Sequence, residues 1–149
     1  MIKVLFVCHG NICRSTMAES VFNYMIRQKG IEDDFIVSSA ATSTEEIGNP
    51  VHHGTVKKLK EKNIPVTPHK AIQITKTDFD KYDYIIGMDS ANIRNLNRIA
   101  GDKAEKVYKL LTFASQSRDI ADPWYTGDFE ETYQDVCKGL EGFLQTLGK

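Results

Sequence analysis

Short apolar runs alternate with amphipathic stretches along this chain, which predicts strands that alternate with helices. Residues 2–7 (IKVLFV) form a β-branched, apolar run typical of a buried parallel strand. Three more strands are predicted over residues 35–37, 83–88 and 106–109. Strands separated by helices form right-handed crossovers, so we expect a parallel sheet with helices on both faces.

Apolar residues at helical spacing predict four helices between and after these strands. The first runs to about Gln28 with Ala18, Val21 and Phe22 on one face, and Gly30 ends it. The other helices are expected over residues 56–62, 91–99 (capped by Asp89 or Ser90) and 129–147. Residues 38–54 and 112–128 are polar and rich in turn-forming residues, and predict long loops.

Composition narrows the class of protein. The 149 residues suit one domain, expected over residues 1–149. A hydrophobic content of 41% excludes a disordered chain, and a net charge of −1 argues against a strongly basic nucleic-acid binder. No apolar run could span a bilayer or act as a signal peptide, so we expect a cytoplasmic protein with no membrane partner.

Three cysteines, Cys8, Cys13 and Cys137, are an odd number for a disulfide framework. The chain has no C-x-x-C motif, and His52-His53 do not match a ligand pair of known spacing, so no metal site is expected. Cys137 falls on the apolar face of the last helix and is expected in the core.

The segment from Cys8 to Arg14 has the pattern C-x5-R between a predicted strand and a predicted helix. Inward-pointing N–H groups and the helix dipole make such a loop an anion site, and Gly10 and Asn11 permit its tight or left-handed turns. Arg14 can hold two phosphate oxygens, while Ser15 can cap the helix or donate to Cys8. A thiol in that field becomes a thiolate, which places a nucleophile beneath a bound phosphate.

Attack on phosphorus needs a proton for the leaving oxygen, and Asp122 is the best candidate general acid. It stands in Asp122-Pro123-Trp124-Tyr125, where Pro123 restrains the backbone and Trp124 and Tyr125 can flank an aromatic substrate. Asp122-Pro123 can equally be the start of a simple turn. Spacing alone leaves both interpretations open.

Together, VCHGNICRS (residues 7–15) and the later DPWY resemble the low-molecular-weight protein tyrosine phosphatases. The likeness covers essentially the whole chain, since SAATSTEEIGNP (residues 39–50) and MDSANIRNLNR (88–98) fall in the expected order. It implies a three-layer, doubly wound α/β fold whose central parallel sheet has about four strands. It also implies hydrolysis of phosphotyrosine and small aryl phosphates through a phosphocysteine, without a cofactor.

The same resemblance assigns roles to individual residues. The nucleophile falls on Cys8, the phosphate clamp on Arg14 and the general acid on Asp122. Ser15 would stabilise the Cys8 thiolate, and Cys13 matches a cysteine that forms a reversible disulfide with the nucleophile. The remaining phosphate- and substrate-binding positions are His9, Gly10, Asn11, Ile12, Glu45, Trp124 and Tyr125, and the loop-supporting ones are Asn11, Ser39 and His69.

Three positions depart from the family's usual pattern. His9 replaces an apolar residue, and Glu45 stands at a rim position that is often aromatic. An acid at position 45 is expected to weaken ring stacking and to repel acidic phosphopeptides. Ile12 stands where relatives that act on phosphoarginine tend to have threonine, which favours phosphotyrosine.

Three other functions are alternatives to a protein-tyrosine phosphatase. A protein-arginine phosphatase is the nearest. A thiol-dependent arsenate reductase needs a further cysteine pair after the third strand, and residues 83–100 contain none. A phosphate-binding module without catalysis conflicts with the presence of Cys8, Arg14 and Asp122. The expected partner is a phosphotyrosine-containing protein, and the chain is expected to be a monomer or weak dimer.

Overall fold

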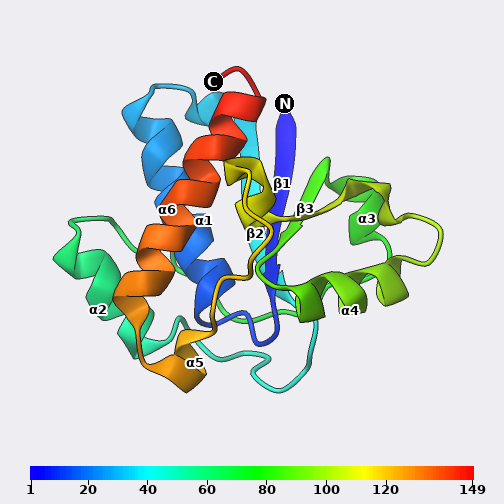
Figure 1. Ribbon diagram of the computed structural model, residues 1–149, viewed down its shortest axis with the longest axis horizontal. Helices are drawn as coiled ribbons and strands as arrows, with labels where there is room; N and C mark the ends of the chain where they lie inside the picture. The colour runs from blue at the N-terminus through cyan, green and yellow to red at the C-terminus, as the bar shows by residue number, and fades with distance from the viewer.

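Four parallel strands form one central sheet in the order β2-β1-β3-β4 in a computed structural model that describes residues 1–149 (Figure 1). The strands are β1 (Ile2–Cys8), β2 (Phe35–Ala41), β3 (Tyr84–Gly87) and β4 (Val107–Lys109), so all four predicted strands are confirmed. The chain crosses from β1 to β2 on one side and then returns to β3 on the other. Ligands of such sheets bind at the carboxyl ends of the strands beside this reversal.

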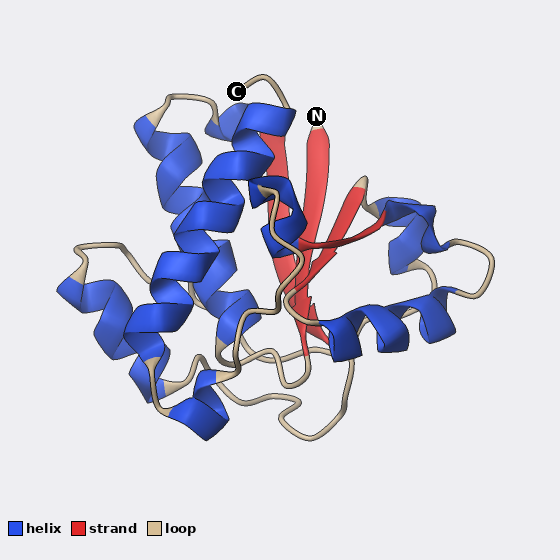
Figure 2. Ribbon diagram, in the orientation of Figure 1, coloured by secondary structure: helices blue, strands red, loops and turns tan.

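Helices cover both faces of the sheet, as predicted (Figure 2). The helix α1 (Arg14–Gln28) packs with α6 (Phe129–Thr146) and α2 (His53–Glu61) on one side. The opposite face is covered by α3 (Asp78–Lys81) and α4 (Ser90–Ala100). A one-turn helix, α5 (Pro123–Thr126), and three 3-10 turns, η1 (Glu32–Asp34), η2 (Ala104–Lys106) and η3 (Leu110–Ala114), complete the fold.

Alternation along β1 divides the core into two layers, because successive side chains of a strand point to opposite faces. Val4 and Phe6 join the larger cluster with α1 and α6, where the rings of Phe6 and Phe22 lie 5.7 Å apart. Leu5 and Val7 join the smaller cluster against α3 and α4. Burial on both faces fixes β1 in the middle of the sheet and thereby places Cys8 at its carboxyl end.

Several predicted boundaries were wrong. Strand β2 continues to Ala41, where residues 38–41 were predicted to begin a loop, because small side chains let them pair with β1 as far as Cys8. Helix α2 begins at His53, three residues before the prediction (56 − 53). The one-turn helices α3 and α5 were not predicted, since four residues carry no helical periodicity.

Cap residues agree better with the predictions. Gly30 follows α1 with a φ of 68°, and Asp89, not Ser90, caps α4 by accepting the N–H of Asn92.

Cys137 was predicted in the core, but it is only half-buried and packs against the margin of the larger cluster. None of the helices has both the length and the apolar composition needed to cross a bilayer.

Candidate active site

The loop from Cys8 to Arg14 connects the carboxyl end of β1 to the amino end of α1. Its turn depends on Asn11, whose φ of 61° lies in the left-handed region. Such a backbone costs a non-glycine residue on the order of 1 kcal/mol and persists only where neighbouring groups hold it. In this conformation, the Asn11 backbone N–H points at Cys8 Sγ, 3.3 Å away.

Hydrogen bonds to the buried side chain of Asn11 hold this turn. Its Nδ2 donates to Ser15 Oγ at 2.8 Å and to Ser39 Oγ at 2.9 Å. Its Oδ1 accepts from His69 Nε2 at 2.7 Å and from the backbone N–H of Ile72 at 3.2 Å. The amide therefore uses both donors and both acceptor sites, which locks the loop to α1, β2 and the segment before α3.

Glu19 lies behind this network and was missed by the sequence reasoning. The Ser39 hydroxyl donates to Glu19 Oε1 at 2.6 Å, and His69 Nδ1 lies 3.8 Å from the same oxygen. Burial raises the pKa of Glu19 to about 7, although the bond from Ser39 opposes the rise. Burial also lowers the pKa of His69. The one sequence signal was a charged residue among the apolar positions of α1.

The two cysteines of the loop have different surroundings. Cys8 Sγ accepts the backbone N–H of Asn11 and lies 3.1 Å from Ser15 Oγ. The Ser15 oxygen accepts from Asn11 Nδ2, so its own hydrogen is free to point at the sulfur. Cys13 precedes the first residue of α1, and burial, followed by the negative charges of Cys8 and Asp122, raises its pKa to about 12. Both thiols are buried and free. The two thiols therefore differ: polar groups face Cys8 Sγ, whereas burial and nearby negative charge favour the protonated form of Cys13.

Arg14 is almost fully buried and reaches three acceptors. Its Nη1 donates to Asp89 Oδ2 at 2.6 Å and to the carbonyl of Ile120 at 2.9 Å, and Nη2 lies 3.5 Å from Asp122 Oδ2. Burial works against the charged guanidinium, but the negative Cys8, Asp89 and Asp122 outweigh it and raise the pKa of Arg14. Asp89 was predicted only as a possible cap of α4, and its bond to Arg14 was not predicted.

Asp122 caps α5, as expected of a turn that starts at Asp122-Pro123, and its carboxyl group also lines the pocket beside Arg14. Its Oδ1 accepts the backbone N–H of Trp124 at 3.0 Å, while its Oδ2 faces Arg14. The backbone of Ile120 is bonded to the carbonyl of Met88 at the end of β3. We call residues 120–126 the Asp122 segment; these contacts hold it over the carboxyl edge of the sheet.

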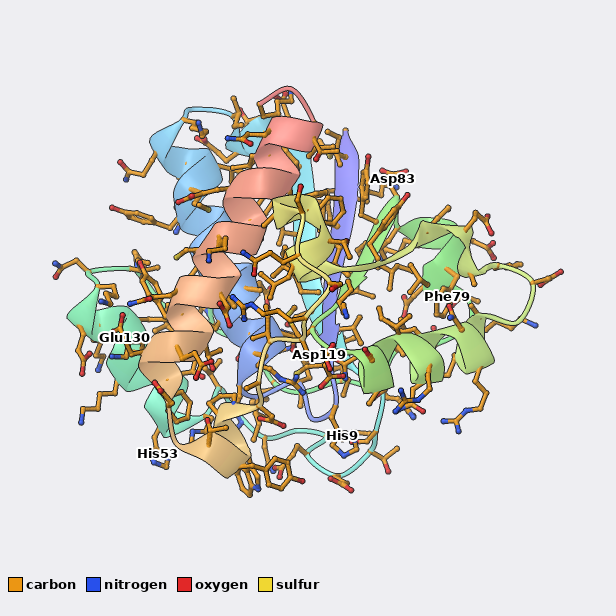
Figure 3. All side chains as sticks on the ribbon, viewed as in Figure 1. His9, His53, Phe79, Asp83, Asp119 and Glu130 are labelled. Carbon is orange, nitrogen blue, oxygen red and sulfur yellow. The ribbon has the colours of Figure 1, made fainter.

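One pocket unites most of the predicted site residues. Trp124 and Tyr125 form its exposed aromatic wall, and His9 Nε2 contacts Glu45 Oε2 at 2.9 Å on the rim. Figure 3 shows His9 at the end of the molecule where α5 and His53 lie. The lining consists of Cys8, His9, Gly10, Ile12, Cys13, Arg14, Glu45, Glu46, Asp122, Trp124 and Tyr125.

The four other predicted residues, Asn11, Ser15, Ser39 and His69, do not line the pocket and lie behind the loop as its support. Glu46 lines the pocket and was not predicted as a site residue; Asn49 Nδ2 donates to its carboxylate at 2.5 Å. No group of three or more His, Cys, Asp or Glu side chains is arranged to hold a metal ion. The arrangement is suited to binding a phosphate ester above a thiolate.

Comparison with known proteins gives a consistent result over the whole chain. Residues 3–149 match the family described as low molecular weight phosphotyrosine protein phosphatase. The chain is 42% identical to the low molecular weight protein-tyrosine-phosphatase YfkJ of Bacillus subtilis, with 100% of this chain and 97% of that protein covered. It is 41% identical to the human low molecular weight phosphotyrosine protein phosphatase, with 96% and 94% covered.

Solved structures agree with the sequence comparison. The crystal structure of YfkJ superposes with a TM-score of 0.95 over 99% of this chain and 95% of that one. A Drosophila arginine phosphatase is also similar, with a TM-score of 0.90 at 27% identity over 99% of both chains. The three-layer α/β fold is therefore shared by proteins named as tyrosine phosphatases and by one named as an arginine phosphatase.

Proposed function

Because the chain belongs to the low molecular weight phosphotyrosine protein phosphatase family, we propose that Cys8, Arg14 and Asp122 carry its reaction. The chain is a cysteine-dependent protein-tyrosine phosphatase. One observation carries the assignment of residues: a thiol that accepts a backbone N–H and lies beside a hydroxyl, a buried guanidinium and a carboxyl group line the same pocket. We propose that residues 1–149 form a single phosphatase domain.

In the first step, the Cys8 thiolate attacks phosphorus and the ester P–O bond breaks. The electron pair of that bond goes to the phenolic oxygen, which takes a proton from Asp122. A phosphocysteine and a free phenol result. The carboxyl group of Asp122 suits this role because its Oδ2 faces Arg14, the residue proposed to hold the phosphate.

In the second step, water attacks the phosphorus of the phosphocysteine. The Asp122 carboxylate takes the water's proton, the P–S bond breaks and the Cys8 thiolate leaves with inorganic phosphate as the other product. The Ser15 hydroxyl, 3.1 Å from Cys8 Sγ, stabilises the departing thiolate. Asp122 is thereby returned to its protonated form for the next cycle.

Arg14 and the loop N–H groups stabilise the charge on the equatorial oxygens in both steps. A planar guanidinium can bond two phosphate oxygens, and its bonds to Asp89 and Ile120 hold it in place before substrate binds. The site thus concentrates positive potential at one point, although the whole chain has a net charge of −1. We propose proteins that carry phosphotyrosine as substrates, together with small aryl phosphates.

A direct test compares Cys8→Ser with the unchanged protein on a phosphotyrosine peptide and a phosphoarginine peptide of the same sequence. We expect turnover of the phosphotyrosine peptide, its loss in Cys8→Ser, and a phosphocysteine trapped by rapid acid quench. Ile12 lines the pocket at the position where relatives that act on phosphoarginine tend to have threonine, and this favours phosphotyrosine as the substrate. Faster hydrolysis of the phosphoarginine peptide would instead support an arginine phosphatase, to which the similarity with the Drosophila enzyme points.

A further inference from the structure

We call residues 8–14 the phosphate loop. His52 lies outside both this loop and the Asp122 segment, yet it is hydrogen-bonded to the phosphate loop. Its backbone N–H donates to the carbonyl of Ile12 at 2.8 Å. One turn into α2, Thr55 Oγ1 donates to the carbonyl of Cys13 at 3.2 Å. The amino end of α2 is therefore fixed to the phosphate loop at two consecutive carbonyls.

The imidazole of His52 contacts the other half of the site. Its ring meets Trp124 edge to face, with centroids 5.5 Å apart and an interplanar angle of 75°. It also stacks on Phe129 at 5.5 Å and 17°. Gly54 permits this approach, since a Cβ there would lie 2.3 Å from Phe129 Cζ. The His52 ring thus contacts one aromatic ring in α5 and another at the first residue of α6.

A hydrogen bond holds the ring of His52 in this orientation. Its Nδ1 accepts the backbone N–H of Gly54 at 3.0 Å and caps α2. A ring nitrogen that accepts carries no proton, so the ring is neutral with its proton on Nε2. Burial, followed by the adjacent His53, lowers the pKa of His52, which favours that neutral ring.

More than half of the Trp124 side chain is open to solvent. It is 55% exposed, and His52 is its aromatic partner. The Trp124 backbone N–H is bonded to Asp122 Oδ1, so a shift of Trp124 moves the carboxyl group proposed as general acid. Because that group must lie within hydrogen-bond reach of the leaving oxygen, small displacements cost rate.

We propose that His52 is a positioning residue that holds Trp124, and through it Asp122, over the phosphate loop. It touches no reacting atom. The proposal rests on the proposed role of Asp122 as general acid. His52 joins the two halves of the site from outside: its backbone is bonded to the phosphate loop, and its ring packs against the Asp122 segment.

The test separates ring contact from helix capping with two variants. His52→Asn keeps a cap acceptor and loses the ring, whereas His52→Phe keeps a ring and loses the acceptor. His53→Ala is the matched control, because His53 stacks on His52 at 4.2 Å but pairs with neither Trp124 nor Phe129. Each variant is assayed for kcat/KM on phenyl phosphate, whose leaving group needs a proton, and on p-nitrophenyl phosphate, whose leaving group does not.

We expect His52→Asn to lower kcat/KM about 10-fold on phenyl phosphate and about 2-fold on p-nitrophenyl phosphate, as partial loss of general acid catalysis requires. His52→Phe and His53→Ala should keep the unchanged protein's ratio of the two esters. The inhibition constant of inorganic phosphate should stay within about 2-fold, which also shows that the loop is folded.

Equal losses on both esters in His52→Asn would overturn the proposal, as would a loss in His52→Phe as large as that in His52→Asn. A weaker inhibition by phosphate would also overturn it, because His52 would then act through the loop. Asp122→Ala distinguishes this failure from failure of the proposed function. Suppose that Asp122→Ala lowers kcat/KM more on phenyl phosphate than on p-nitrophenyl phosphate, but His52→Asn lowers both equally. Then only the proposed role of His52 is wrong.

Discussion

Arg14 Nη1 and Asp89 Oδ2 lie 2.6 Å apart, although 75 residues separate them in the chain. Asp89 comes from the junction of β3 and α4, where its other oxygen accepts the N–H of Asn92 at 2.7 Å. One carboxylate therefore caps a helix and orients the proposed phosphate clamp. The guanidinium is fixed before substrate arrives, so less conformational entropy is lost on binding.

Replacing Asp89 by Ala should affect both functions of its carboxylate. We expect inorganic phosphate to inhibit about 10-fold more weakly, because Arg14 loses its strongest anchor. The lost cap should lower the free energy of unfolding by about 1 kcal/mol. Phosphate inhibition and urea unfolding measure the two effects.

Asp128→Ala is the control for that prediction, since the Asp128 carboxylate caps α6 by accepting the N–H of Glu131 and does not line the pocket. It should lower stability by a similar amount without weakening phosphate inhibition. If the two variants change phosphate inhibition equally, Asp89 does not orient Arg14.

Asp122→Ala should separate substrates by the leaving group. We expect kcat/KM on phenyl phosphate to fall by about 10² to 10⁴-fold, the usual contribution of a general acid, and by about 10-fold or less on p-nitrophenyl phosphate. Equal losses on both esters would contradict the assignment of Asp122.

Glu19 should make stability depend on pH. Its carboxyl group ionises at its ordinary pKa in the unfolded chain, but burial raises the pKa to about 7 in the folded protein. Between these values the folded state binds more protons than the unfolded state, so stability falls as pH rises to about 7. Below the ordinary pKa of a glutamate, Glu19 does not change the free energy of unfolding. Above pH 7, its ionisation lowers that free energy by up to about 3 kcal/mol.

Urea unfolding of Glu19→Gln between pH 4 and 8 measures this effect. The variant should lose less stability than the unchanged protein as pH rises. Glu105→Gln provides the control, because Glu105 is exposed in η2 at the opposite end of the sheet. Parallel stability curves for Glu19→Gln and the unchanged protein would show that Glu19 keeps the same pKa on unfolding.

Glu45 should influence which phosphopeptides are used. Its carboxylate is exposed on the pocket rim beside His9, so Glu45→Gln should raise kcat/KM for a peptide with acidic flanking residues about 2- to 5-fold at low salt. For a peptide with lysines in place of those acidic residues, Glu45→Gln should lower kcat/KM, and by a smaller factor. An identical change with both peptides would mean that the charge of Glu45 does not select substrates.

Contiguous residues were enough to predict much of this protein. The run IKVLFV specified a buried strand, and the next residues up to Ser15 contained the whole phosphate loop, because its chemistry lies within one short segment. Helical periodicity likewise located α1 and α6. Boundaries failed where pairing overrode composition, as in residues 38–41, whose small polar and apolar side chains resemble a loop until β1 lies beside them.

Long-range partners required the folded chain. The contacts of Asp89 with Arg14, of Glu19 with Ser39 and of His52 with Trp124 cannot be predicted from neighbouring residues. The sheet order and the packing of α2 bring these partners together. From the sequence alone, Asp89 is a candidate helix cap, Glu19 is a charged residue in a mostly apolar helix, and His52 is one of two adjacent histidines. Short-range patterns thus encode the elements and the reactive loop, whereas distance, burial and charge in the folded protein determine what supports that loop.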